Sequence, residues 1–597
     1  MFKIVQNLPI PRFIIKLATL VPAAVKGFLR ATPRTGFSPT RTASLLALVG
    51  FACSAPPPAP TPESSGSPFV ELGPGAGLVK VHTGGGPDKE YIVEAKGGGS
   101  ALLDAEGDGD LDIYWVNGAY LEAPTAGSGN ALYLNNGSAS FTDVAARAGV
   151  EGHGWGMGAL SGDVDNDGDA DLYVTCLQEN ILYCNDGAAS FTAITAGAGV
   201  EAPRWSTGAA FADFDLDGDI DLYVAHYAAF DQDEITPLGA QWKGENIFIG
   251  PLGLLPEPDL LYRNNGDGTY SDVSDATGIS EIDPGYGLGV LFADADADGD
   301  ADLYVANDSS PNFLFLNGGD GTFAEVALEA GVAFGDMGQA QAGMGLARGD
   351  FDGDTQMDML VTNFEDDYNT LYRNNGDGTY SDVTFALGLG SITLPYVGFG
   401  TAFFDADNDA DLDLLVANGH VYPQIEDAGS GNTYAQPNFL FENRGAKFSL
   451  LLPGPADSLG STQVSRGAAL GDFDNDGALD IFITNLNAAP VLLRNNLPGG
   501  KNWLGLRLRA TQGNRDAIGA RVVLAAAGRR QVREVTAGSS FLGSADRRLH
   551  FGLDNAARVD TLTVHWPGGT RQIFRDLPVN VYLNLEELTA TWKRADL

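Results

Sequence analysis

The chain of 597 residues is poor in cysteine, histidine and basic residues, with 3 Cys, 6 His and 35 Lys+Arg against 78 Asp+Glu. Three cysteines are too few for a disulfide scaffold. The formal net charge of −43 argues against direct binding to nucleic acid or an anionic membrane, since both require basic surfaces. The sequence also lacks an HExxH metal motif, a Walker loop and a GxSxG elbow. Apolar residues make up 44% of the chain, which predicts a folded protein rather than a disordered polyanion.

The acidic excess belongs to one part of the chain. Residues 1–53 carry seven basic and no acidic residues, and residues 501–597 carry 15 basic and nine acidic residues. The body, residues 54–500, therefore holds 69 acidic and 13 basic residues, a net charge of −56. A length of this kind predicts several domains, or one large repeat domain with an appendage.

Residues 1–53 are expected to be an export signal. A mostly apolar run, residues 43–52, follows several arginines and ends at Cys53, and it is too short to span a bilayer as a helix. The arrangement resembles a bacterial lipoprotein signal with Cys53 as the acylated residue, although Gly50 stands where that pattern usually has an aliphatic residue. Simple secretion and an ordinary buried hydrophobic segment are the alternatives. Residues 54–68, rich in Pro, Ser and Gly, are expected to form a tether.

An acidic loop recurs seven times in the body, with carboxylates at its positions 1, 3, 5 and 9. Hard oxygen ligands at this spacing on a tight turn are what Ca²⁺ prefers, and Mg²⁺ is the lesser candidate. The loops therefore predict up to seven calcium sites. The predicted ligands are Asp104, Glu106, Asp108 and Asp112; Asp163, Asp165, Asp167 and Asp171; Asp213, Asp215, Asp217 and Asp221; Asp294, Asp296, Asp298 and Asp302; Asp350, Asp352, Asp354 and Asp358; Asp405, Asp407, Asp409 and Asp413; and Asp472, Asp474, Asp476 and Asp480.

Position 6 of each loop must turn sharply, which glycine does at little steric cost. Glycine fills it in five loops, but Thr355 and Ala410 occupy it in the loops that begin at Asp350 and Asp405. We expect these two loops to be the weakest or the most strained.

A second element alternates with the loops, a hairpin with Asn-Gly or Asp-Gly at its turn, as in residues 261–273 and 371–383. Each repeat is then predicted to contain strand 1, the acidic loop, strand 2, a connector, strand 3, the hairpin turn and strand 4. The start-to-start spacings of the loops, 50 to 81 residues, fit one four-stranded blade each. The fold class is therefore predicted to be all-β, with a seven-bladed β-propeller over residues 69–500.

The acidic loops and the Gly-rich strands before them, such as residues 154–158 and 285–289, resemble the FG-GAP/VCBS repeats of integrin α-subunit propellers. Residues 516–522, 551–553 and 564–569 are similar to the ASPIC/UnbV module of the cartilage acidic protein family. The resemblance implies a secreted, calcium-binding propeller protein and no catalytic residues. We expect residues 501–590 to form a small β-sandwich or barrel, followed by a tail at 591–597.

Strand order places the connectors that carry insertions, about residues 228–258 and 419–437, on the face opposite the acidic loops. The aromatic residues Trp155, Trp205, Tyr286 and Tyr396 are predicted on the same face, where they either contact a ligand or fill the packing between blades. Two further side chains of this face, His226 and His420, are expected to be solvated, with metal binding or base catalysis as alternatives. Cys176 and Cys184 lie on adjacent strands and either pair or stay free.

These features predict an exported calcium-binding protein of the bacterial cell envelope, lipid-anchored or secreted, that acts in binding or adhesion. The alternatives are a propeller enzyme acting on polysaccharide, as a lyase or glycosidase, and a structural envelope component. We expect an extracellular protein or glycan partner, no nucleic acid, and membrane contact only through a lipid anchor at Cys53. The pairs Arg529-Arg530 and Arg547-Arg548 are expected either to bind an anionic glycan or to dock on the acidic body of the same chain.

Overall fold

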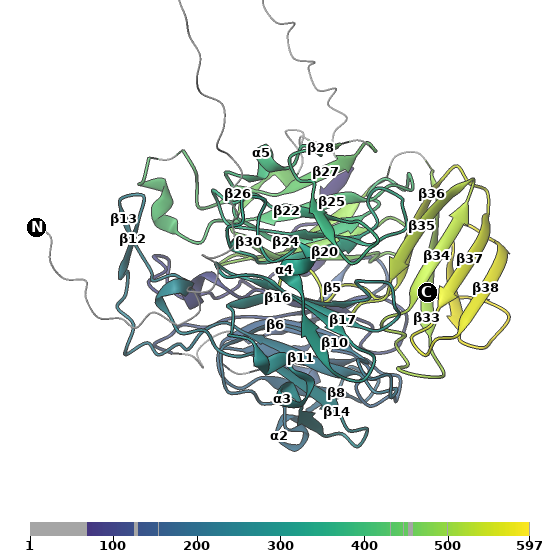
Figure 1. The fold of residues 1–597 in the computed structure, drawn as a ribbon, viewed down its shortest axis with the longest axis horizontal. Coiled ribbons are helices and arrows are strands. Elements are labelled where there is room, and N and C mark those ends of the chain that lie inside the picture. The colour runs from purple at the N-terminus through teal and green to yellow at the C-terminus, as the bar shows by residue number, and fades with distance from the viewer. Residues whose placement is uncertain are drawn as a thin grey trace, which may run out of the picture. The chain divides into compact units, whose positions relative to one another are not determined.

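The computed structural model describes residues 68–123, 129–152, 154–429, 431–445, 447–451, 458–497 and 500–595 (Figure 1). The predicted export signal, Cys53 and nearly all of the tether therefore lie outside the described residues. Among the helices in the described ranges, none has the length and apolar character that crossing a membrane requires.

The described body consists of seven four-stranded antiparallel sheets. Their strands, in spatial order, are β2 (Ser100–Leu103), β3 (Asp112–Trp115), β4 (Ala131–Asn135) and β5 (Phe141–Asp143); β6 (Gly156–Gly162), β7 (Asp171–Cys176), β8 (Ile181–Asn185) and β9 (Phe191–Ala193); β10 (Ser206–Ala212), β11 (Asp221–His226), β14 (Leu260–Asn264) and β15 (Tyr270–Asp272); β16 (Gly287–Ala293), β17 (Asp302–Asn307), β18 (Phe313–Asn317) and β19 (Phe323–Glu325); β20 (Leu346–Gly349), β21 (Asp358–Val361), β22 (Thr370–Asn374) and β23 (Tyr380–Asp382); β24 (Gly398–Phe404), β25 (Asp413–Asn418), β27 (Phe439–Asn443) and β28 (Phe448–Leu450); and β30 (Ser465–Gly471), β31 (Asp480–Asn485), β32 (Val491–Asn495) and β1 (Phe69–Glu71).

The first strands of these sheets contact one another in cyclic order, from β2 through β6, β10, β16, β20 and β24 to β30, which returns to β2. Apolar clusters fill the spaces between neighbouring sheets, as where Tyr223 and Leu261 pack with Val290 and Leu303. The second strands are buried along their whole length. Burial on both faces explains why each second strand has a nearly continuous apolar run.

The seventh sheet takes its fourth strand from the other end of the body. Strand β1 pairs antiparallel with β32, so that Phe69 lies opposite Asn495. The expectation that every repeat supplies its own fourth strand is therefore wrong for the seventh. Phe69 is buried against Phe404 of the sixth sheet, which ties the start of the body to its end.

Short helical turns and small ladders join the strands. Four-residue helices follow the fourth strands of sheets one to four, and each ends at a left-handed glycine such as Gly149. The helices are α1 (Ala145–Ala148), α2 (Thr195–Ala198), α3 (Ser274–Thr277), α4 (Ala327–Ala330) and α5 (Gly390–Thr393). The 3-10 turns are η1 (Pro74–Ala76), η2 (Ile92–Ala95), η3 (Pro251–Gly253), η4 (Ile279–Glu281), η5 (Pro423–Glu426) and η6 (Ser458–Gly460). The small ladders are β12 (Ala240–Trp242) with β13 (Glu245–Ile247), and β26 (Gln436–Pro437) with β29 (Thr462–Gln463).

The C-terminal residues form a separate β module of two four-stranded sheets, drawn in yellow-green and yellow in Figure 1. An apolar cluster that includes Leu506, Val522, Phe551 and Leu562 draws on strands of both sheets. One sheet has the order β36 (Leu549–Asp554), β33 (Asn502–Arg509), β39 (Tyr582–Glu586) and β40 (Lys593–Arg594); the other has β35 (Arg529–Glu534), β34 (Arg521–Ala526), β37 (Val559–His565) and β38 (Arg571–Leu577). The mostly β fold and the C-terminal β module are as predicted.

Candidate metal centres

Each acidic loop joins the first and second strands of its sheet, and in five of the loops the fold visibly brings the carboxylates at positions 1, 3 and 9 together. Within the described residues, six groups of acidic or other metal-ligating side chains have one ligand atom from each member within 4.8 Å of the others. Five of them are Asp163, Asp165 and Asp171; Asp213, Asp215 and Asp221; Asp294, Asp296 and Asp302; Asp350, Asp352 and Asp358; and Asp405, Asp407 and Asp413.

The predicted ligands at position 5 are not part of these five groups. In the second loop, the carboxylate of Asp167 is exposed and accepts the backbone N–H of Asp169 at 2.9 Å. Equivalent bonds occur in the other six loops, at 2.7 to 3.0 Å. Position 5 thus closes the turn of the loop, while positions 1, 3 and 9 converge.

The carboxylate at position 9 also fastens the loop to the sheet. Both oxygens of Asp171 accept backbone N–H groups, one from Val164 of the loop at 2.9 Å and one from Asn185 of the third strand at 2.8 Å. The same pair of bonds occurs at Asp112, Asp221, Asp302, Asp358, Asp413 and Asp480. The sequence reasoning assigned position 9 to the metal alone and missed this second task.

Carboxylate oxygens without a hydrogen-bond partner lie buried in all seven loops. Both oxygens of Asp163 and both of Asp213 are of this kind, as are single oxygens of Glu106, Asp294, Asp350, Asp407 and Asp474. Burial raises the pKa of Asp163 to about 7 and that of Asp213 to about 6, because a charged carboxylate loses its hydration there. Buried acceptors without donors are costly unless a cation compensates them, so the donor set fits Ca²⁺.

The turn at position 6 has a positive φ in all seven loops. The angle is 76° at Thr355 and 75° at Ala410, and it lies between 89° and 108° at the five glycines. Thr355 and Ala410 therefore adopt a left-handed conformation, which is unfavourable for residues that carry a side chain. This agrees with the strain predicted for these two loops. In these loops the N–H of position 6 still donates to the carboxylate of position 1, at 3.1 Å for Thr355 and 2.7 Å for Ala410.

An asparagine at the end of each third strand joins neighbouring loops. The Nδ2 group of Asn185 donates to the carbonyl of Ala170 in its own sheet at 3.1 Å and to that of Ala105 in the preceding loop at 3.0 Å. The bond to the preceding loop recurs at Asn135, Asn264, Asn317, Asn374, Asn443 and Asn495, and that of Asn135 reaches Phe473 of the seventh loop. Sequence reasoning missed these residues, although an Asn precedes every hairpin turn of the repeat.

The C-terminal module contacts the rim that carries the loops. The hydroxyl of Tyr582 donates to Asp472 at 2.8 Å, and the N–H of Asp163 donates to Asp516 at 2.9 Å. Of the paired arginines, Arg548 donates to the carbonyl of Asp472 at 3.0 Å and Arg529 to that of Asp409 at 2.9 Å.

Residues 537–544 of the module, which we term the plug segment, lie inside the ring of first strands. Ser540 exchanges two backbone hydrogen bonds with Leu346 of β20, both 2.8 Å long. Other bonds run to β2, β6, β10 and β24, and the ring of Phe541 packs against that of Phe399 at 4.8 Å. Because the segment touches first strands from five sheets around the ring, it fills the ring's interior.

On the opposite face, the residues proposed to meet a ligand are largely buried. Trp155, Trp205 and Tyr286 are at most 7% exposed and belong to the same apolar cluster as Phe541. These three side chains therefore fill the packing between blades, which is the second of the two predicted alternatives. Tyr396 is half-buried and packs its ring against that of Phe439 at 4.8 Å.

His226 and His420 have no solvent exposure, so the expectation that they are solvated is wrong. Nδ1 of His420 accepts the N–H of Tyr422 at 3.0 Å, which leaves Nε2 to donate to Glu365 at 3.1 Å. Burial raises the pKa of Glu365, but hydrogen bonds from His420, Lys243 and Asn432 outweigh it and hold the pKa at about 2. Lys243 and His420 belong to the two insertions, so Glu365 joins them across this face.

Cys176 and Cys184 are both free. Leu172 lies opposite Tyr183, which places Cys184 beside the first residue of β7 and leaves Cys176 at its far end. This register keeps the two sulfurs apart, so they do not form the disulfide that was one of the two expectations.

Comparisons with known proteins identify two kinds of repeat or domain. A family model described as FG-GAP-like repeat matches residues 104–174, 294–361 and 350–416, and one described as ASPIC and UnbV matches residues 510–591. Human cartilage acidic protein 1 is 30% identical over 336 residues, which cover 54% of this chain and 47% of the human protein. The mouse protein of the same name is 29% identical over 336 residues, covering 54% and 48%.

The chain thus spans about half the length of the curated relatives it matches. Among solved structures, a lectin of Agrocybe aegerita, described as recognising non-reducing terminal N-acetylglucosamine, aligns at 18% identity with a TM-score of 0.35. That alignment covers 66% of this chain and 86% of the lectin. By sequence, the chain carries FG-GAP-like repeats together with an ASPIC and UnbV domain and is a distant homologue of cartilage acidic protein 1.

Proposed function

We propose that this protein is an exported, calcium-stabilised binding protein built on a seven-bladed β-propeller. The propeller interpretation is supported by the seven four-stranded sheets, whose first strands contact one another in a closed cycle. The calcium assignment is supported by the buried carboxylate oxygens without donors that occur in every loop. This second observation carries the proposal, because hydrogen bonding within the chain leaves these oxygens uncompensated.

In each loop, the carboxylates at positions 1, 3 and 9 would hold the ion. Calcium would supply two positive charges where buried acids crowd together, and thereby favour the folded loop over its open form. Seven ions would lower the net charge of the body from −56 to −42 and leave a strongly acidic surface. The position 9 residues would anchor the site, since they already bind the loop and the third strand.

The proposed binding role depends on which surfaces of the protein are accessible to a partner. The plug segment occupies the interior of the ring, and Glu365 joins the two insertions on the opposite face. For this reason we favour the rim loops and the C-terminal module as the surfaces for a partner. The enzyme alternative named His226 and His420 as its base, and neither reaches solvent. We therefore favour an extracellular glycan or protein ligand over a polysaccharide substrate.

A panel of neutral and acidic polysaccharides, scored for cleavage and for retention, separates the three functions. Retention of the intact polymer supports a binding protein. Release of shortened or unsaturated products would contradict the proposal in favour of a lyase or glycosidase. If the polysaccharides are neither retained nor cleaved, and no protein partner is captured from the cell surface, the result supports the structural alternative.

Export and acylation of Cys53 are part of the same proposal. In cells that export the full chain, we expect a membrane-associated form whose mass shows lipid at Cys53. Replacing Cys53 with Ser should release the protein into the medium. A wild-type protein recovered from the cytoplasm with residues 1–52 attached would contradict export itself.

A further inference from the structure

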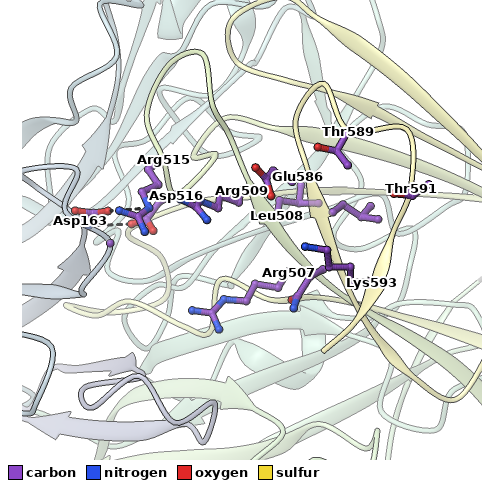
Figure 2. Close-up of a pocket in the computed structure, with 13 residues that line it drawn as sticks. Asp163, Arg507, Leu508, Arg509, Arg515, Asp516, Glu586, Thr589, Thr591 and Lys593 are labelled. Atoms are coloured by element: carbon purple, nitrogen blue, oxygen red, sulfur yellow. Dashed lines mark hydrogen bonds and ion pairs between the residues drawn. The ribbon is translucent and has the colours of Figure 1, made fainter. Parts of the chain in front are cut away.

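A cleft of about 310 Å³ lies where the C-terminal module meets the second acidic loop (Figure 2). Basic side chains line much of it, namely Arg507, Arg509, Arg515 and Lys593. Such a concentration is unusual in a chain with a net charge of −43, and it belongs to the one basic module of the protein.

Strand pairing explains why these cations share a face. Arg507 and Arg509 are exposed and alternate along β33 with the buried Leu508. Arg507 lies opposite Asn584 of β39, and Asn584 lies opposite Lys593 of β40. Residues paired across neighbouring strands point to the same side of a sheet, so the three strands present their polar side chains to one surface.

The cations of the cleft are only partly neutralised by the chain itself. Arg507 is 55% exposed, and its closest carboxylate is Asp104 at 4.0 Å. Across the described ranges, the side chains of Arg509 and Lys593 form no ion pair or hydrogen bond, and Figure 2 shows both lining the cleft. Asp516, an acid of the same lining, is already paired with Arg547 at 3.3 Å.

Two further carboxylates line the cleft: Asp163 lies 3.9 Å from Arg515, and Glu586 of β39 lies opposite Arg509 of β33 in the pairing of these strands. Four cations of the lining thus face three carboxylates, and one of these, Asp516, is paired with an arginine outside the lining, so the cleft keeps a small excess of positive charge for a ligand.

The rest of the lining is polar or apolar. Thr589, Thr591 and Asn584 provide hydroxyl and amide groups, while the apolar residues Leu508 and Leu585 are 8% and 1% exposed. A surface of this kind offers little to an apolar peptide side chain. It suits a ligand that combines hydroxyl groups with oxyanions, since guanidinium groups bind carboxylate and sulfate through paired hydrogen bonds.

We propose that this cleft binds the sulfate or carboxylate groups of an acidic polysaccharide. The proposal names a ligand for the binding function above and rests on it, but it does not require calcium. Arg507 and Arg509, both on β33, would bind one oxyanion, and Lys593 of β40 would bind a second. The threonines would bind sugar hydroxyls.

The test uses the full-length protein and the double variant Arg509→Gln/Lys593→Gln. The matched control is Arg530→Gln/Arg575→Gln, which removes the same charge from exposed residues of the module that do not line the cleft. Binding of dextran sulfate, alginate and neutral dextran is measured by titration at two salt concentrations. Dextran sulfate and alginate distinguish sulfate from carboxylate as the recognised group. Equal melting temperatures of all three proteins confirm that the variants fold.

We expect the wild type and the control to bind at least one acidic polymer, more weakly at the higher salt, and not to bind dextran. The cleft variant should bind about tenfold more weakly, because two of four cations are removed. If the cleft variant and the wild type bind with equal affinity, the cleft is not the binding site, although the proposed binding function still stands. If the wild type binds none of the polysaccharides, the glycan-binding function itself fails. Binding of poly-glutamate instead of the polysaccharides would overturn this proposal in favour of an acidic peptide.

Discussion

At the scale of single residues, the acidic loop divides its carboxylates between two tasks. In the second loop, both oxygens of Asp171 at position 9 accept backbone N–H groups and the side chain is fully buried, whereas Asp165 at position 3 is exposed. The repeated pattern of acids predicted a metal site at both positions. It could not separate them, because the N–H groups that bind position 9 come partly from a strand 14 residues further along the chain.

This division predicts different effects of two isosteric substitutions. Asp171→Asn replaces an acceptor with an NH₂ group that faces a backbone N–H, so it should lower the free energy of unfolding by about 1–3 kcal/mol even in the presence of a chelator. Asp165→Asn removes one of three crowded carboxylate charges, so it should leave the stability in chelator unchanged or slightly higher and lower it when calcium is present. Urea unfolding of both variants, with calcium and with chelator, measures the difference. Equal losses for the two variants in chelator would contradict the division.

The left-handed residues at position 6 predict a stabilising substitution. Ala410→Gly relieves a φ of 75° and should raise the free energy of unfolding by about 1 kcal/mol, with tighter calcium binding at that loop. Ala301→Gly, at position 8 of another loop and without a positive φ, should lower stability instead. Denaturant midpoints of the two variants provide the measurement, and a loss of stability in Ala410→Gly would show that the loop is not strained.

At the scale of elements, much of the repeat could be predicted from the sequence. The Asp-rich loops and Asn-Gly hairpins are local patterns, so they revealed the order of strands within a sheet. The closing strand β1 could not be predicted in this way, because its partner β32 lies more than 400 residues away and its three residues carry no motif. One clue was present, since seven acidic loops were accompanied by only six hairpins. The short helices that follow the fourth strands were also missed, as four residues leave too little periodicity to detect.

The closing strand has a direct test. Phe69→Ala removes a ring that is 2% exposed and packs between the sixth and seventh sheets, so unfolding free energy should fall by about 3–5 kcal/mol. Val70 on the same strand is 51% exposed, and Val70→Ala should have little effect. Thermal unfolding of the two variants compares them. Similar melting temperatures for both would mean that β1 does not close the body.

At the scale of the whole molecule, the acidic body and the basic module interlock. The plug segment hydrogen-bonds to first strands from five sheets, and arginines of the module bind carbonyls of the acidic loops. The opposite charges of the two regions were evident from composition. The plug segment was not, because its Gly-Ser-Ser sequence is typical of an ordinary loop, and its burial arises only from the ring that surrounds it.

This arrangement predicts that damage inside the ring destabilises the body as well as the module. Phe541→Ala removes a fully buried ring from the interior and should lower the melting temperature of the whole protein in a single transition. Leu588→Ala, at a residue 59% exposed on the same module, is the control. Two separate transitions in calorimetry, with only the module affected, would show that the two regions do not unfold together.

We expect the stability of the whole molecule to depend on a cation that compensates the buried acids of the seven loops. Calorimetry of the full-length protein, first stripped with a chelator and then titrated with Ca²⁺ through about 10⁻⁴ to 10⁻³ M, tests it most directly. We predict a melting temperature that rises steeply with calcium concentration, because the ion binds the native loops and not the unfolded chain. A melting temperature unchanged between chelator and millimolar calcium would contradict the metal assignment and with it the proposed role of the seven loops.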